Sequence, residues 1–150
     1  ADLAFFSHQP SLPYHWIFLK KDPMVVAVSC SHPLASRSSI SLRELEKETL
    51  IMPAYGADLD VENLLRSRDL KIHSSISTIQ NYSAMGLVEQ GLGVLIMNEL
   101  ITKGRLNHLC LLPLDPPQYI KLGIAVSDLN RSSPAAQRFI RYAKEIIPKL

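Results

Sequence analysis

The chain has 150 residues, the usual size of one domain, and is long enough to bury a hydrophobic core. Its residues are 47% hydrophobic and 20% charged, which predicts a folded, soluble protein. The net charge of +2 gives no general electrostatic reason to bind nucleic acid, and every apolar run is far shorter than the ~18 residues of a membrane span. The opening residues ADLAFF lack the basic and apolar regions of a secretory signal. A protein whose signal had been cleaved off would lack these regions too.

Short apolar runs alternate with amphipathic stretches along the chain, which predicts an α/β fold with largely parallel strands. The predicted strands are Leu3–Phe6, Met24–Val28, Leu50–Met52, Ile72–Ser77, Val94–Met97, Leu109–Leu112 and Leu122–Val126. The predicted helices lie near Leu42–Glu46, Leu59–Arg68, Tyr82–Gln90 and Pro134–Ile147.

Two of these helices carry recognisable start signals. Ser41 and Glu44 have the spacing of a capping box. Ser133 is suited to cap the last helix, with Pro134 in its first position. The last helix then carries an apolar stripe, which we expect to pack against a large surface. The stripe consists of Ala136, Phe139, Ile140, Ala143, Ile146 and Ile147.

The segment NYSAMGLVEQGLGVLIMN predicts a helix, a glycine stop and a buried strand. Ala84, Leu87 and Val88 fall on one helical face, and Gly91 stands where a left-handed cap belongs. The continuous apolar run Val94–Met97 suits a strand that is buried on both faces.

Polar residues open this helix. Asn81, Tyr82 and Ser83 lie at its amino end, where free backbone N–H groups and the positive end of the helix dipole attract anions. A small acidic ligand is therefore the first partner to consider.

Other signals give no support for catalysis or for a metal. Gly91-Leu92-Gly93 follows a helix and precedes a strand, which is the reverse of the order in a dinucleotide loop. Asp58, Asp60 and Glu62 lack calcium-loop spacing and suit the acidic first turn of a helix. The histidines show no paired ligand spacing, no nucleophile elbow is present, and His32 is expected to be structural.

Two cysteines lie in apolar or strand-like surroundings. We expect Cys30 and Cys110 to be free thiols that pack as small hydrophobic residues in a reducing compartment. A structural disulfide is the alternative, and a redox switch would require an exposed thiol with a low pKa.

Proline-marked stretches separate the two ends of the chain from its middle. These stretches, Leu12–Pro23 and Pro113–Tyr119, predict two crossings between domains, which together would form a hinge. The opening strand and the last helix would then belong to one domain, of which only a part is present.

The order of six motifs resembles the effector-binding domain of LysR-type transcriptional regulators. The motifs are Asp2-Leu3-Ala4-Phe5, Met24–Ser29, Ser31-His32-Pro33-Leu34-Ala35, Ile40-Ser41-Leu42-Arg43-Glu44-Leu45, Leu87-Val88-Glu89-Gln90-Gly91-Leu92-Gly93-Val94 and Ser133-Pro134-Ala135-Ala136-Gln137-Arg138-Phe139. No single motif is decisive, but their joint order and spacing are specific, and they cover essentially the whole chain.

The resemblance implies an α/β fold like that of type 2 periplasmic binding proteins, with two subdomains joined by two crossover strands and an effector in the cleft between them. Residues 1–17 and 124–150 would be parts of an incomplete subdomain I, 24–116 would be subdomain II, and 18–23 and 117–123 would be the crossovers. The winged helix-turn-helix that binds DNA, the linker helix and the first part of subdomain I would precede Ala1. The loop whose hydroxyl groups commonly hold the effector carboxylate in this family would also be missing.

The family's pattern places the remaining half of the effector pocket at two positions. The loop after Leu50–Met52 maps onto Pro53, Ala54, Tyr55 and Gly56, and the amino end of the next helix but one maps onto Asn81, Tyr82 and Ser83. Met97 and Asn98, at the carboxyl end of a strand, are a third candidate. The alternative roles are a plain turn capped by Asp58, helix capping by Asn81 or Ser83, and core packing by Met97.

The resemblance therefore implies a cytoplasmic regulatory domain that senses a small, anionic metabolite. Its partners would be that effector, further copies of itself through contacts between subdomains I and II, and DNA through the missing domain only. No membrane partner, metal, cofactor or catalytic residue is expected. The alternative is a solute-binding protein of a transport system, which shares the fold. An enzyme built on the same cleft would need an acid, base or nucleophile constellation, which the sequence does not offer.

Overall fold

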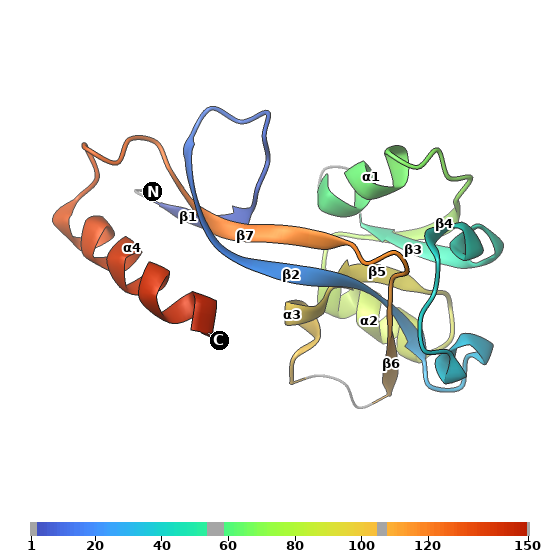
Figure 1. Ribbon diagram of the computed structural model, residues 1–150. Helices are drawn as coiled ribbons and strands as arrows, with labels where there is room; N and C mark the ends of the chain where they lie inside the picture. Colours follow the sequence, from blue (N-terminus) through green and yellow to red (C-terminus); the bar gives the residue numbers. More distant parts are fainter. Residues whose placement is uncertain (1–2, 54–58, 105–107, 150) are drawn as a thin grey trace. The chain divides into compact units, whose positions relative to one another are not determined.

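The computed structural model describes residues 3–53, 59–104 and 108–149 (Figure 1). The chain forms two compact units: unit 1 consists of residues 1–22 and 120–150, and unit 2 consists of residues 23–119. Strands β2 (His15–Ser29) and β7 (Tyr119–Val126) each run from one unit into the other. The middle of the chain is therefore one unit, and the two ends together make the other.

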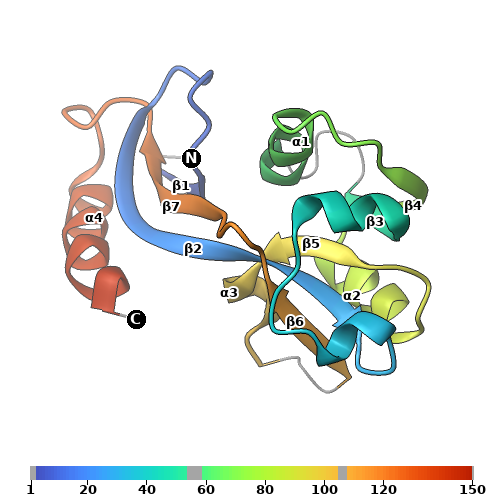
Figure 2. The same ribbon diagram turned by 45° about the vertical axis from the view of Figure 1, so that its right-hand side comes forward.

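Unit 1 is a sheet covered by one helix. Strand β1 (Ala4–Ser7) pairs antiparallel with β7, which lies between β1 and the first part of β2. Helix α4 (Pro134–Ile146) lies beside these strands (Figure 2). It packs on them through Ile140 and Ala143, which share a core with Leu19, Ile124 and Val126. A short 3-10 helix, Ile147–Lys149, follows α4.

Unit 2 is built around the second part of β2. Strands β5 (Leu95–Asn98) and β6 (Leu109–Pro113) pair antiparallel with it on its two sides. Strand β3 (Thr49–Pro53) pairs in parallel with β4 (His73–Thr78) and joins β5 through a parallel bridge. The helices are α1 (Leu59–Arg66), α2 (Asn81–Glu89) and α3 (Glu99–Thr102), with 3-10 helices at Pro33–Ser36 and Leu42–Lys47.

The prediction of largely parallel strands is wrong. The pairs β1–β7, β2–β5 and β2–β6 are antiparallel, whereas β3–β4 is a parallel ladder. The apolar runs showed only that the strands are buried on both faces, and burial of this kind is commonest in parallel sheets. Residues 24–29 are buried throughout although β2 has antiparallel neighbours, so burial did not report strand direction.

Strand β2 is also far longer than the predicted strand Met24–Val28. It begins at His15 and continues through Pro23, where the sequence suggested a break. Proline cannot donate a backbone hydrogen bond to a sheet, so it is usually found at the end of a strand or in an edge strand. Here Pro23 is the first residue of unit 2, so it marks the passage of a continuous strand from one unit to the other. Helix α3 and the 3-10 helix at Pro33–Ser36 were not predicted because both are only four residues long.

The predicted helix, glycine stop and buried strand are confirmed. Gly91 has a φ of 73° and ends α2. Its N–H donates to Val88 O at 2.9 Å, and the N–H of Leu92 donates to Leu87 O at 3.1 Å, which together make a Schellman motif. The strand that follows is buried on both faces, since Val94 to Met97 are at most 3% exposed.

Gly93 allows the close approach of two backbone segments. The N–H of Val94 donates to Thr49 O at 2.9 Å. A Cβ atom at position 93 would lie 2.5 Å from that same carbonyl oxygen. The second glycine of Gly91-Leu92-Gly93 is therefore explained by the packing of β5 against β3.

The Ser41 and Glu44 pair forms as predicted, at the start of a 3-10 helix. The Glu44 carboxylate accepts hydrogen bonds from the Ser41 N–H and from its hydroxyl, each at 2.8 Å. The backbone hydrogen bond from Ser41, its hydroxyl and the guanidinium of Arg37 at 3.0 Å hold the pKa of Glu44 below its usual value. The start of this helix is thus fixed by local polar contacts.

Helix α4 begins as predicted but buries less of its stripe than expected. The Ser133 hydroxyl accepts the N–H of Ala136 at 3.2 Å, and Pro134 follows the cap. Phe139 and Ile146 remain 46% and 51% exposed, because the buried face follows the narrower spacing of Ala136, Ile140 and Ala143. The Phe139 ring instead meets Phe5 edge to face, with ring centroids 5.8 Å apart.

We expect Ser133→Ala to lower the free energy of unfolding by about 1 kcal/mol, because it leaves an N–H group of the first turn of α4 without its side-chain acceptor. Ser133→Asp is the matched control, since aspartate caps as well as serine and is favoured near the helix dipole. Urea unfolding followed by circular dichroism measures both variants. Equal stability of Ser133→Ala and Ser133→Asp would contradict the capping role.

Candidate functional site

Three parallel strands of unit 2 end at one edge. The last pair of the β3–β4 ladder is Pro53 with Thr78. The bridge between Leu50 and Val94 places β5 in parallel beside β3, so that β5 ends at Asn98 on the same edge. Ligands of α/β sheets favour the carboxyl ends of such strands.

The amino end of α2 lies at this edge too. The helix begins at Asn81, three residues after Thr78, and Asn81, Tyr82 and Ser83 are all exposed. Its buried face packs through Ala84, Met85 and Val88 on the core that holds Ile51 of β3 and Met97 of β5. The packing of these apolar side chains therefore fixes the first turn of α2 beside the strand ends.

The cap of α2 differs from the prediction. The helix was expected to begin at Tyr82 with Asn81 or Ser83 as possible caps, but Gln80 occupies the cap position with an extended backbone. The Gln80 side chain makes no capping hydrogen bond. Asn81 and Ser83 lie inside the first turn, so neither one is the N-cap.

The third candidate pair divides between surface and core. Met97 is 1% exposed and belongs to the hydrophobic core of unit 2. Asn98 is half-buried and occupies the cap position of α3. Asn98 is therefore partly accessible at the edge, whereas Met97 is buried in the core.

The first candidate loop is only partly described. Pro53 ends β3, in register with Thr78. Ala54, Tyr55 and Gly56 lie outside the described residues, and so does Asp58, the expected cap of α1. The structure thus brings together Pro53, the first turn of α2 and Asn98.

Sequence reasoning missed one residue of this edge. Thr78 is half-buried, and its hydroxyl accepts the N–H of Gln80 at 3.3 Å. It therefore shapes the turn that leads from β4 into α2. Its place at the carboxyl end of a strand was the available signal, but the predicted strand stopped one residue earlier, at Ser77.

Unit 1 holds an open depression in its surface. It is lined by Pro13, Tyr14, His15 and Ser127, with a volume of about 280 Å³, and it is wide open to solvent. The Tyr14 hydroxyl exchanges hydrogen bonds of 3.2 Å with the backbone of Gln9, which fixes one wall. Nothing in the sequence singled out these residues.

The other sequence signals take structural roles. The Nδ1 atom of His32 accepts the N–H of Leu34 at 3.2 Å, and its Nε2 atom lies 3.4 Å from a Glu48 oxygen. Asp60 and Glu62 lie in the first turn of α1. Within residues 3–53, 59–104 and 108–149, no three histidine, cysteine or acidic side chains gather as metal ligands would. No helix in these ranges has the length and hydropathy needed to cross a membrane.

Comparison with known proteins defines the class of the fold and then the family. The chain superposes on the regulatory domain of CcmR from Synechocystis PCC6803 in complex with 2-PG, with a TM-score of 0.85, 23% identity and coverage of 99% of this chain and 74% of that one. It also superposes on the effector-binding domain of QuiR in complex with shikimate, with a TM-score of 0.83, 22% identity and coverage of 97% and 73%. The expected type 2 periplasmic-binding-protein-like α/β fold is confirmed.

A family model described as LysR substrate binding domain matches residues 1–147, so the chain belongs to this family. It is 32% identical over 139 residues to the "Uncharacterized HTH-type transcriptional regulator YvbU" of Bacillus subtilis (strain 168), covering 91% of this chain and 48% of that protein. The chain thus spans about half the length of the curated relatives it matches.

Proposed function

We propose that this chain is the effector-binding part of a transcriptional regulator and that its effector is a small anion. The observation that carries the proposal is the exposed first turn of α2, which stands at the common carboxyl edge of β3, β4 and β5. Membership of the LysR substrate-binding family supports a binding domain over a catalyst.

The chemistry of this edge suits a carboxylate. The first turn of α2 has its backbone N–H groups at the positive end of the helix dipole, and the Gln80 side chain makes no capping hydrogen bond there. Asn81 and Ser83 add an amide and a hydroxyl that can donate hydrogen bonds, and the exposed Tyr82 adds a phenol. Shikimate, which is bound to QuiR in its solved complex, is a small carboxylate.

The proposed contact residues are those of the strand ends and the helix start. They are Pro53, Ala54, Tyr55, Gly56, Asn81, Tyr82, Ser83, Met97 and Asn98. In this proposal Ser83 and Tyr55 donate hydrogen bonds to the effector, while the buried Met97 acts through the core in which it packs.

We expect Ser83→Ala and Tyr55→Ala, in the complete protein, each to weaken effector binding about tenfold, because one hydrogen bond to a charged group is worth about 1.5–3 kcal/mol. The fold should change little, since Ser83 is exposed. A panel of small carboxylates that includes shikimate is first screened by thermal shift, and the best binder is then measured by titration calorimetry.

Matched controls separate the site from general surface effects. Ser36→Ala changes an exposed serine of a 3-10 helix, and Tyr142→Ala removes a tyrosine of α4 that is 56% exposed. Both should leave the affinity unchanged. A carboxylate that binds the Ser83 and Tyr55 variants as tightly as the wild type would remove these residues from the site.

The domain plan is part of the proposal. Residues 1–17 and 124–150 would contribute to subdomain I, 24–116 would form subdomain II, and 18–23 and 117–123 would be the crossovers. We further propose that DNA is bound by a separate winged-helix segment, that copies associate through contacts between the two subdomains, and that the protein works in the cytoplasm, where its DNA lies.

A transport protein is the second candidate on this fold, but the regulator family favours the first. Mass spectrometry of the natural protein, directed at what precedes Ala1, separates the two. A basic winged-helix segment would support the regulator. A cleaved signal peptide or a lipid-modified cysteine would overturn it.

A further inference from the structure

Ile79 is the most exposed large apolar side chain among the residues that the structure describes. It lies in the turn between β4 and α2 and is 76% exposed. The residue before an N-cap often packs on the fourth helical residue as a hydrophobic staple. Ala84 holds that fourth position in α2 and is buried in the core, but Ile79 is too exposed to gain much from such a contact. Stapling of the helix therefore does not explain an isoleucine at this position.

Tyr82 adds a second exposed apolar surface to the same short segment. It stands three residues after Ile79, in the first turn of α2, and is 54% exposed. The first backbone hydrogen bond of α2 runs from the N–H of Ala84 to Gln80 O at 3.0 Å, so the N–H groups of residues 81–83 have no acceptor within the helix. Two exposed apolar side chains thus flank the helix end that the proposed function assigns to a carboxylate.

The described residues of this edge, 78–83 and 98–100, include no basic side chain. The helices that follow β5 and β3 instead carry acidic residues in their first turns, Glu99 in α3 and Asp60 in α1. A helix amino end carries about half a positive charge, which favours one negative charge but does not neutralise two. The edge therefore suits a monoanion better than a dianion.

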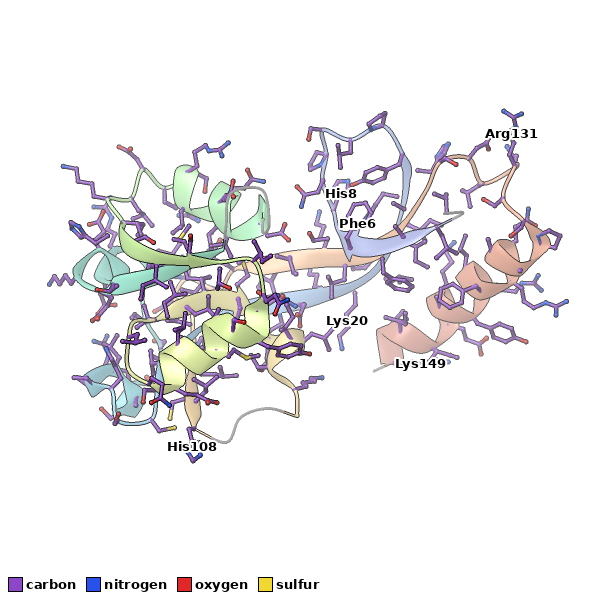
Figure 3. All side chains as sticks on the ribbon, turned by 180° about the vertical axis from the view of Figure 1, so that it is seen from behind. Phe6, His8, Lys20, His108, Arg131 and Lys149 are labelled. Atoms are coloured by element: carbon purple, nitrogen blue, oxygen red, sulfur yellow. The ribbon has the colours of Figure 1, made fainter. Side chains whose placement is uncertain are left out.

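Basic residues of unit 2 gather at the opposite ends of these strands. Lys47 precedes β3 and Lys71 precedes β4, so both stand where a strand begins. Strands β5 and β6 both pair antiparallel with β2 and so run in the same direction. His108, which Figure 3 labels at the start of β6, therefore lies at the end opposite Asn98. Lys103 stands at the C-cap of α3, a position where cations are favoured.

We propose that the effector is a monocarboxylate with an aromatic or branched apolar body and that Ile79 selects for this body. This inference rests on the proposed function. The carboxylate accepts hydrogen bonds at the first turn of α2, and the body covers Ile79 and the ring of Tyr82, which removes apolar surface from water. Two side chains offer far less than the ~800 Å² that each partner buries in a stable protein interface, so they suit a small molecule.

Titration calorimetry of the complete protein at neutral pH tests this inference with matched probes. Acetate, phenylacetate and phenylmalonate differ by a ring and then by a second negative charge, and 4-methylpentanoate supplies a branched body. We expect phenylacetate or 4-methylpentanoate to bind at least about tenfold more tightly than acetate and than phenylmalonate, because burial of one large apolar side chain is worth about tenfold or more in affinity. Binding should also show a negative heat-capacity change, the marker of buried apolar surface.

Variants of Ile79 show whether this residue makes the selection. Ile79→Ser should weaken the tighter apolar carboxylate about tenfold and leave the affinity for acetate within about twofold, whereas Ile79→Leu should keep the wild-type preference. Ile146→Ser is the matched control, because Ile146 is an isoleucine of α4 that is 51% exposed, and it should leave every affinity unchanged. Circular dichroism checks that each variant folds.

Ser83→Ala distinguishes this inference from the proposed function, since it should weaken acetate and the apolar carboxylates alike. If Ser83→Ala does so but Ile79→Ser keeps the preference for the apolar body, the role of Ile79 is refuted and the anion site stands. Equal or tighter binding of acetate or phenylmalonate would likewise refute only the ligand class. A complete protein that binds none of the four probes would refute the anion site and this inference together.

Discussion

Gly123→Ala should destabilise unit 1 by about 3 kcal/mol, the upper range for overpacking a core. A Cβ atom at position 123 of β7 would lie 2.3 Å from the carbonyl oxygen of Ile17 and 2.6 Å from the ring of Trp16. Rotation of the ring would relieve only the contact with Trp16, because the Ile17 oxygen belongs to the backbone of the neighbouring strand. Relief would therefore require β2 and β7 to separate.

The chain carries its own probe for this experiment. Trp16 is the only tryptophan, and its ring lies over Gly123 and 4.4 Å from the centre of the His8 ring. Its fluorescence should report the unfolding of unit 1 in urea. Gly86→Ala is the matched control, because nothing lies within 4 Å of a Cβ atom there and alanine is the better helix former.

The control should be as stable as the wild type or more stable by up to about 1 kcal/mol. A Gly123→Ala protein with the same midpoint as Gly86→Ala would show that β7 and β2 are not held as closely as the structure has them. A double variant that also carries Trp16→Leu should recover only part of the loss, because the clash with the Ile17 oxygen remains. Its unfolding is followed by circular dichroism, since it lacks the tryptophan probe.

Met97→Ala should cost about 3 kcal/mol of the free energy of unfolding, and this change tests whether Met97 is core or site. Met97 is 1% exposed and packs in the core of unit 2 with Val25, Ile51 and Val88. Truncation removes buried apolar surface and leaves a cavity. Urea unfolding followed by circular dichroism measures the loss.

Met97→Leu is the matched control, since it nearly conserves volume and should cost less than about 1.5 kcal/mol. If Met97 serves the site only by packing, the leucine variant should bind the effector found in the carboxylate screen as tightly as the wild type does. Normal stability together with lost affinity in the leucine variant would instead make Met97 a direct contact.

Local signals in the sequence were enough to predict the elements that depend on neighbouring residues. The Ser133 cap, the Ser41–Glu44 pair and the Gly91 stop each rest on contacts within a few positions of the chain, and all three form. The order of six motifs along the whole chain then identified the family. Hydrophobic periodicity alone predicts only local helices and strands, so it could not have done so.

Long-range features were predicted poorly from the same sequence. Whether β2 has parallel or antiparallel neighbours depends on which distant segments pair with it. An apolar run looks the same in both cases, so it does not predict the direction of pairing. The exposure of Phe139 depends on which face of α4 packs on the sheet. Cys30 is exposed, so the expectation that it packs as a small hydrophobic residue is wrong, and its exposure depends on where β2 ends.

For the candidate site, the sequence located the start of α2. The roles of Gln80 as the N-cap and of Thr78 as the acceptor of its N–H could be recognised only from the geometry of the turn.

The division of the chain also orders its folding. Unit 2 is one continuous stretch, residues 23–119, whereas unit 1 is assembled from segments on either side of it. During synthesis, at about 5–20 residues per second, unit 2 can complete its core while β1 and the start of β2 still wait for β7 and α4. The exposed edge of β2 in that interval is where a nascent chain would be most open to wrong pairing, and the arrival of residues 120–146 closes it.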